Sequence, residues 1–160
     1  MKPFPDAYGR EPALTKAAAI KQLKKQFSHK SVEKELWDVF SLYIRARDNW
    51  TCFTCGRSKR RDPDTVFQAG HLFTRGKAAI KYDERQVFCQ CAGCNFRHNS
   101  DPDIYRERFI KVFGQARYDT IYQMRNAPCK RTVADMRLMI DHYKQKYEAL
   151  KGQPCRMKPT

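Results

Sequence analysis

Two pairs of cysteines, each with the spacing C-x-x-C, constrain the fold of this chain more than any other feature. Cys52 and Cys55 lie in "CFTCGR", and Cys91 and Cys94 lie in "CQCAGCN". A C-x-x-C turn presents two thiolates to one tetrahedral ion, so two such turns can complete a closed four-cysteine Zn²⁺ site. The alternatives are unrelated thiols or a thioredoxin-like redox pair. Two pairs that flank two short apolar runs favour structural zinc.

The segment between the pairs, residues 56–90, is longer than a simple zinc ribbon needs and leaves room for a β-hairpin. "TVFQAGHLF" (65–73) and "QVFCQ" (86–90) predict two short strands, and residues 78–84 between them predict a turn or a short helix. Cys89 is expected to be a buried strand residue, whereas Cys129 and Cys155 follow no pattern.

Helical patterns lie on both sides of this central region. Residues 15–27 predict a basic helix, and residues 31–48 predict a second one with Ser31 as N-cap and an apolar face. Further helices are predicted from Asp101, as N-cap, to Gly114, and over residues 115–126.

The last predicted helix, residues 132–152, has Thr132 as N-cap and Asp135 three residues later, a variant of the capping box. Its apolar stripe runs from Val133 to Leu150 and most simply packs on the core. A short dimer-forming coiled coil is the alternative.

A formal net charge of +15 predicts a polyanionic partner. The excess is not confined to a tail, because residues 1–30 carry +5 and residues 101–160 carry +6. The chain has no apolar run of about 18 residues, and its first residues lack the apolar region of a secretory signal, so we expect no membrane association. The chain has seven cysteines, an odd number. In a chain that is not secreted, this number favours metal ligation over disulfides.

These patterns divide the chain into three segments. We expect a basic N-terminal arm and helix over residues 1–30, a zinc-stabilised core with its flanking helices over residues 31–126, and a C-terminal helix and tail over residues 127–160.

The stretch "AGHLFTRGKAAIKYDERQVFCQCAGCN" (69–95) resembles the HNH, or ββα-metal, nuclease motif. Its combination of "AGH", "DER", "QC" and "CN" is similar to the phage NinG (Rap) recombination endonucleases, and "FSLYIRARD" and "YRERFIKVFG" resemble that family's flanks. The resemblance covers about residues 31–125. It implies an α+β fold with an HNH-type ββα-metal core on a treble-clef zinc module, flanked by N- and C-terminal helices.

The resemblance implies catalytic roles for three residues. His71, at the end of the first strand, matches the general base that deprotonates the attacking water. Gln86 stands where such motifs usually have the asparagine that fixes the loop and orients the histidine. Asn95 matches a metal ligand at the start of the following helix. The plainer interpretation of His71 is an ordinary histidine at a strand end.

A catalytic divalent ion, Mg²⁺ or Mn²⁺, is also implied by the resemblance. His98 and Asn99 are candidates for a second ligand or a phosphate contact, with a solvated helix position as the alternative for His98. Gly70 stands where many HNH motifs have an aspartate ligand. Mg²⁺ tolerates few protein carboxylates because it keeps several waters and takes phosphate oxygens. His29 and His142 have no partner pattern and are expected to be inert.

Basic residues beside the motif are predicted to contact phosphates, with a solvated charged surface as the alternative. These residues are Arg57, Lys59, Arg60, Arg61, Arg75, Lys77 and Arg97. No pattern predicts readout of bases, so DNA shape is expected to matter more than sequence.

The resemblance implies a metal-dependent DNA endonuclease of phage recombination, acting in the cytoplasm of the bacterial host. Its implied substrates are branched DNAs, such as Holliday junctions or displaced-strand structures, and a homodimer would place two active sites on opposing strands. Two alternatives stay open. One is a non-catalytic zinc-containing module that binds DNA or RNA, and the other is an HNH nickase that acts on ordinary duplex DNA.

Overall fold

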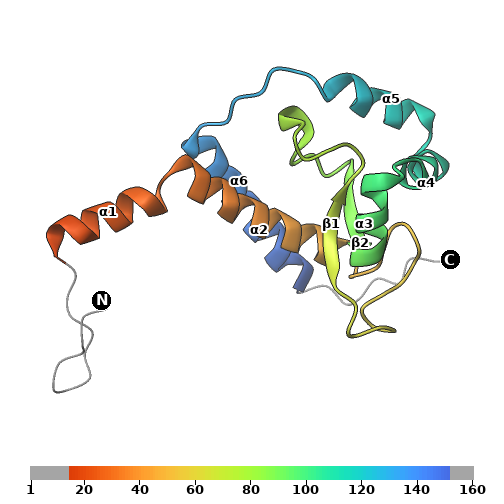
Figure 1. The fold of residues 1–160 in the computed structure, drawn as a ribbon, viewed down its shortest axis with the longest axis horizontal. Helices are drawn as coiled ribbons and strands as arrows, with labels where there is room; N and C mark the ends of the chain where they lie inside the picture. The colour runs from red at the N-terminus through yellow and green to blue at the C-terminus, as the bar shows by residue number, and fades with distance from the viewer. Residues whose placement is uncertain (1–14, 152–160) are drawn as a thin grey trace.

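The computed structural model describes residues 15–151, which form six α-helices, a short 3₁₀ helix and a two-stranded sheet (Figure 1). The expected N-terminal arm over residues 1–14, the C-terminal tail and Cys155 lie outside the described residues. The elements along the chain are α1 (Lys16–Gln26), α2 (His29–Arg47), β1 (Phe67–His71), η1 (Ala78–Ile80), β2 (Val87–Cys91), α3 (Ala92–Ser100), α4 (Asp103–Phe113), α5 (Gln115–Met124) and α6 (Val133–Lys151).

The starts of two helices differ from the sequence-based prediction. Helix α2 begins at His29 because the hydroxyl of Ser28, not that of Ser31, caps it by accepting a hydrogen bond from the Ser31 N–H at 3.3 Å. Helix α4 begins at Asp103, and the Asp101 carboxylate accepts from the Asp103 N–H at 3.2 Å. Asp101 therefore contributes to this helix start from one position further out than the prediction placed it.

Helix α6 confirms the predicted capping box and the predicted packing. The Thr132 hydroxyl accepts from the Asp135 N–H at 3.1 Å, and the Asp135 carboxylate accepts from the Thr132 N–H at 2.8 Å. Figure 1 shows α6 alongside α2, and the buried residues of both helices share one hydrophobic core. Its members on α6 are Met136, Ile140 and Tyr143. Most of the stability of such a helix comes from burying this apolar face.

Strands β1 and β2 pair antiparallel, with Phe67 opposite Cys91 and His71 opposite Val87. Strand β1 is shorter than the predicted run over residues 65–73, and strand β2 is shifted by one residue from the predicted run over residues 86–90. The segment 78–84 contains the short helix η1. Side chains alternate across a strand, so Val87 joins the core of α2 and α6, whereas Phe88 joins a second core made with α4 and α5. The sheet is thus covered by helices on both faces.

An ion pair fixes the end of α2 against the sheet. Arg47 and Asp48 are paired at 2.8 Å. The Arg47 guanidinium also donates to the carbonyl of Val87 at 2.8 Å, and the Asp48 carboxylate accepts from the Cys89 N–H at 2.7 Å. Because both partners of the pair bond to β2, the position of α2 relative to the strands is set by directed contacts as well as by apolar packing.

Cys89 is fully buried in β2, as predicted. Within the part of the chain that the structure describes, no helix has the length and apolar character needed to cross a membrane.

Candidate functional site

The four cysteines of the two C-x-x-C pairs come together at one end of the sheet. Their sulfur atoms all lie within 4.8 Å of one another, and the Sγ atoms of Cys55 and Cys91 are 3.9 Å apart. In a tetrahedral site with Zn–S bonds of about 2.3 Å, neighbouring sulfurs lie roughly 3.8 Å apart. The geometry of the donor set therefore fits one tetrahedral ion, and the cluster could hold a metal ion such as zinc.

Local structure places each thiol. Cys52 and Cys55 flank a tight turn in which the Gly56 N–H donates to the Cys52 carbonyl at 2.9 Å, and Gly56 has φ +75°, which favours glycine. Cys91 ends β2, and Cys94 lies in the first turn of α3. Burial opposes ionisation of Cys55, but the Arg57 N–H and the neighbouring thiols outweigh it and lower the pKa of this thiol.

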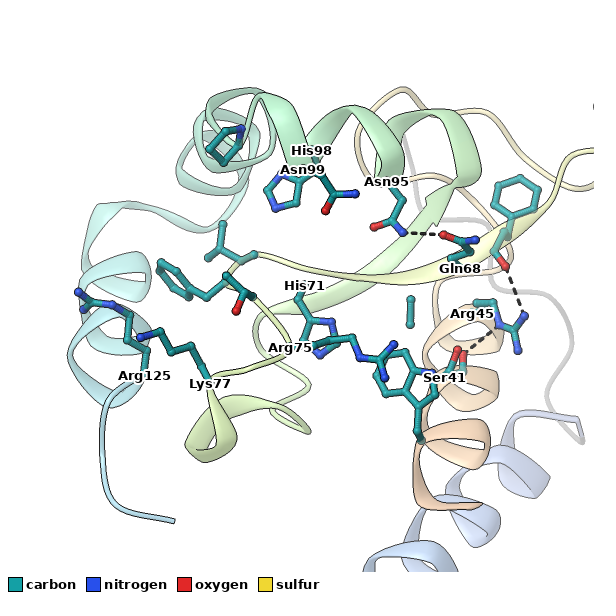
Figure 2. A pocket seen from close by; sticks show the side chains of 17 residues that line it. Ser41, Arg45, Gln68, His71, Arg75, Lys77, Asn95, His98, Asn99 and Arg125 are labelled. Carbon is teal, nitrogen blue, oxygen red and sulfur yellow. Dashed lines mark hydrogen bonds between the residues drawn. The ribbon is translucent and has the colours of Figure 1, made fainter. Parts of the chain in front are cut away.

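A cleft of about 730 Å³ opens between α2, β1, the segment after β1, and α3 (Figure 2). Helix α5 borders it through Arg125, which follows its last turn. Six residues that the sequence predicted for the site line this one cleft. They are His71, Arg75, Lys77, Asn95, His98 and Asn99.

His71 ends β1 and is 94% buried, with its ring stacked on the indole of Trp37 at a centroid distance of 5.3 Å. Its Nε2 lies 2.8 Å from the Lys81 carbonyl. Because a carbonyl can only accept, Nε2 carries the proton and Nδ1 holds the lone pair of the neutral ring. Burial lowers the pKa of His71 to about 4, against the effect of the Lys81 carbonyl, so the ring is neutral at pH 7.

Gln86 lies behind the cleft, fully buried, and holds the segment between the strands in place. Its side-chain N–H₂ donates to the Ile80 carbonyl at 2.8 Å, and its side-chain oxygen accepts from the Phe73 N–H at 3.1 Å. Ile80 is next to Lys81, whose carbonyl bonds His71. Gln86 therefore makes no hydrogen bond with the imidazole, but it fixes the backbone that orients the ring.

Helix α3 presents Asn95 and Asn99 to the cleft one turn apart. The Asn95 side-chain N–H₂ donates to the Gln68 side-chain oxygen at 2.6 Å, which leaves the Asn95 oxygen as a free acceptor. His98 is half buried, and burial lowers its pKa against the effect of the carbonyls of His71 and Leu72. Asn95, His98 and Asn99 thus present uncharged amide and imidazole groups, which could act as ligands, on the wall of the cleft that α3 forms.

Gly70, which stands where many HNH motifs have an aspartate, lies under the side chain of Gln90 from the neighbouring strand. A Cβ atom at Gly70 would lie 1.8 Å from the Gln90 side-chain oxygen. Gln90 is fully buried, and its N–H₂ donates to the Thr54 hydroxyl at 2.7 Å. The packing of β2 therefore excludes a carboxylate at this position, and among the described residues the cleft lining contains neither aspartate nor glutamate.

Several lining residues were missed by the sequence reasoning. Arg45 and Ser41 come from α2, Gln68 comes from β1, and Arg125 follows α5 (Figure 2). Arg45 donates to the Ser41 carbonyl at 3.0 Å and to the Phe67 carbonyl at 3.3 Å, so it bridges α2 and β1. Only the docking of α2 on the strand brings it here. Arg125 was visible as a basic residue near the end of a predicted helix.

The other predicted basic residues lie outside the main cleft. Arg57, Lys59, Arg60 and Arg61 are exposed on the segment that joins the first cysteine pair to β1. Arg57 pairs with Asp62 at 3.7 Å, and Lys59 donates to backbone carbonyls of its own loop. Arg97 is exposed on α3 beside a smaller pocket. His29 and His142 do not line the cleft.

Comparison with known proteins places this chain close to one group of phage proteins. The family described as "Bacteriophage Lambda NinG protein" matches over residues 9–153. "Protein ninG" of Escherichia phage 933W is 30% identical over 121 residues, which is 74% of this chain and 58% of that protein. "Protein ninG" of Escherichia phage lambda is 28% identical over 121 residues, 74% of this chain and 57% of that protein.

The chain thus spans less than two thirds of the length of these curated relatives. No solved structure matches it.

Proposed function

The chain belongs to the bacteriophage NinG family, and on this premise we propose that it is a metal-dependent DNA endonuclease of phage recombination that cleaves branched DNA. The observation that carries the proposal is the single cleft that gathers a neutral, oriented histidine, two asparagines and several cations. These are the groups that phosphodiester hydrolysis needs: a base for water, oxygen and nitrogen donors for an ion, and partners for phosphate.

His71 is the proposed general base, in an HNH-type arrangement of β1, β2 and α3. Its Nδ1 takes a proton from the attacking water, and the resulting positive charge sits on a ring whose Nε2–H already donates to the Lys81 carbonyl. Stacking on Trp37 and the bond to Lys81 fix the ring plane, so the lone pair keeps one direction. Gln86 acts as a positioning residue through the backbone at Ile80 and Lys81.

Asn95, His98 and Asn99 are the proposed protein donors to a catalytic Mg²⁺ or Mn²⁺. When bound, such an ion would stabilise the charge that develops on the phosphate and on the leaving 3′ oxygen. The free side-chain oxygen of Asn95 fits this use, since its amide N–H₂ is already engaged by Gln68. Because the described lining has no carboxylate, the ion would keep several waters and take its remaining ligands from the phosphate.

Zinc at the four cysteines is proposed as a structural ion on a treble-clef module. All four ligand positions of a tetrahedral ion would be filled by thiolates, which leaves none for water or substrate. The site holds the turn at residues 52–55 against the junction of β2 and α3, and so fixes the helix that carries Asn95.

Arg45, Arg75, Lys77 and Arg125 surround the cleft and would bind the phosphates on either side of the scissile bond. Arg57, Lys59, Arg60, Arg61 and Arg97 would extend this contact over the neighbouring surface. The proposals of a branched substrate and of a homodimer rest on the family resemblance. The net positive charge of the chain supports binding to DNA of any structure.

A non-catalytic zinc module that binds DNA or RNA is the second candidate function. The absence of a carboxylate from the described cleft lining favours it, because most sites that hold catalytic Mg²⁺ include at least one. A nickase of ordinary duplex DNA is a third.

The experiment that separates these functions incubates the full chain and Mg²⁺ with a four-way junction and with a linear duplex of the same sequence. Preferential junction cleavage is the expected result. Equal cleavage of both DNAs indicates the nickase, and binding without any cleavage indicates the non-catalytic module.

A further inference from the structure

Phe96 is the most exposed large apolar side chain among the described residues. It is 79% exposed, compared with 71% for Leu138 and 61% for Val66. Its ring forms none of the aromatic pairs found in the part of the chain that the structure describes. Exposing a phenylalanine to water is unfavourable, and no packing within the described structure offsets it here.

The position of Phe96 links it to the cleft. It follows Asn95 directly on α3, a helix that buries none of its own residues and lies on the surface of the sheet. Asn99, which lines the cleft, is three residues further along and therefore on a neighbouring part of the same helix face. Phe96 thus lies on the helix that forms one wall of the cleft containing His71, beside the residues that line it.

Basic residues lie next to Phe96 on α3 and in the lining of the cleft beside this helix. Arg97 is the next residue and is exposed. The start of α3 is tied to Val66, since the Ala92 N–H donates to the Val66 carbonyl at 2.9 Å. Val66 is itself exposed, and the segment before it carries Asp62 and Asp64 as well as Arg60 and Arg61. The cleft beside α3 is lined by Arg45, Arg75, Lys77 and Arg125 and, among the described residues, by no carboxylate. An exposed apolar ring next to these cations complements a partner that has both phosphates and apolar base faces.

We propose that Phe96 inserts its ring into the base stack of DNA bound beside the cleft. Apolar side chains that enter a base step interrupt stacking, and separating an intact step is energetically unfavourable. A step that is already open, at a nick or beside an unpaired nucleotide, avoids most of this cost. Phe96 therefore gives the protein a preference for DNA with an interrupted stack. The inference rests on the proposed function only in that DNA occupies the cleft.

The test measures binding in the absence of cleavage. The dissociation constant of the full, zinc-containing chain is measured without added Mg²⁺ for an intact duplex and for the same duplex with one unpaired nucleotide. Phe96→Ala is compared with the wild type, and Leu138→Ala serves as the matched control because Leu138 is similarly exposed on α6. A 2-aminopurine beside the unpaired nucleotide reports insertion through its emission.

Phe96→Ala is expected to raise the dissociation constant for the interrupted duplex roughly 5- to 150-fold, the range for loss of one base–aromatic contact. The preference over intact duplex and the 2-aminopurine response should disappear, and Leu138→Ala should change neither. An equal loss of affinity for both DNAs, or no loss, would overturn the proposal. A change in the oligomeric state of the DNA-free protein in Phe96→Ala would also overturn it, because the residue would then be assigned to a contact between copies of the chain.

Failure of the nuclease proposal gives a different result. A protein that binds interrupted duplex through Phe96 but never cleaves DNA would leave this inference standing and remove the catalytic one.

Discussion

Replacing Gly70 with alanine tests the packing beneath the candidate base in the most direct way. The added Cβ would lie 1.8 Å from the Gln90 side-chain oxygen and 2.7 Å from its Cδ, so one of the two side chains must shift. Gln90 has little freedom to do so, because it is fully buried and its N–H₂ is bonded to the Thr54 hydroxyl. We therefore expect Gly70→Ala to destabilise the protein.

The magnitude follows from two contributions. Loss of the Gln90–Thr54 hydrogen bond costs about 1 kcal/mol, and overpacking a filled site costs about 1–3 kcal/mol. Against these, alanine restricts the unfolded chain and contributes about 0.4–1 kcal/mol of stability. Taking each range near its middle, we expect a net loss of about 2 kcal/mol in the free energy of unfolding.

The assay is a double-mutant cycle with Gln90→Ala, followed by urea unfolding of the zinc-loaded, reduced protein. Once Gln90 is truncated, Gly70→Ala has nothing to clash with and should be neutral or slightly stabilising. The coupling between the two positions should then be about 2–3 kcal/mol, within the usual range for residues in contact. An equal effect of Gly70→Ala in both backgrounds would refute the proposed reason for glycine at this position.

Three further predictions concern pH, metal and charge. Burial holds the pKa of His71 in the folded protein at about 4, below a value of about 6.5 in the unfolded chain. Between these values the unfolded chain binds more protons than the folded protein, so the contribution of neutral His71 to the free energy of unfolding is complete above pH 6.5 and is lost as the pH falls toward 4. The stability difference between wild type and His71→Gln should change by about 3 kcal/mol over that interval in urea unfolding, and a constant difference would contradict the assigned burial. Natively purified protein should contain one zinc per chain, and Cys91→Ser should lose both the metal and the ordered central region by metal analysis and NMR; an unchanged fold would contradict this. Arg60→Glu combined with Arg61→Glu should lower affinity for all DNA sequences and flatten its salt dependence, measured as the slope of log affinity against log salt; affinity that is already insensitive to salt in the wild type would contradict the electrostatic basis.

Local chemistry explains why much of the fold could be predicted from the sequence. The capping box at Thr132 and Asp135, the apolar stripe of α6 and the convergence of the four cysteines all depend on short spacings, and the structure confirms each of them. The start of α2 was placed three residues late because two serines, Ser28 and Ser31, can each cap a helix, and the sequence does not distinguish them.

The candidate site depended partly on contacts that no short pattern encodes. His71 and Asn95 could be selected from the resemblance, and the structure places both on one cleft. Arg45 and Trp37 reach that cleft only because α2 packs across β1, and Gln68 matters only through its bond to Asn95 on another element. The glycine at position 70 likewise depends on a side chain twenty residues away, Gln90, which the strand register brings over it.

The proposal that His71 is the general base is tested most directly by single-turnover cleavage of a four-way junction at saturating Mg²⁺. His71→Ala should cleave about 10²–10⁴-fold more slowly than the wild type, the usual contribution of a positioned base. Zinc content, folding at pH 7.5 and junction affinity are measured in parallel to separate chemistry from structure, and His142→Ala, outside the cleft, should cleave at the wild-type rate. Cleavage by His71→Ala at a rate close to that of the wild type would contradict the catalytic assignment and favour the zinc-containing DNA-binding module.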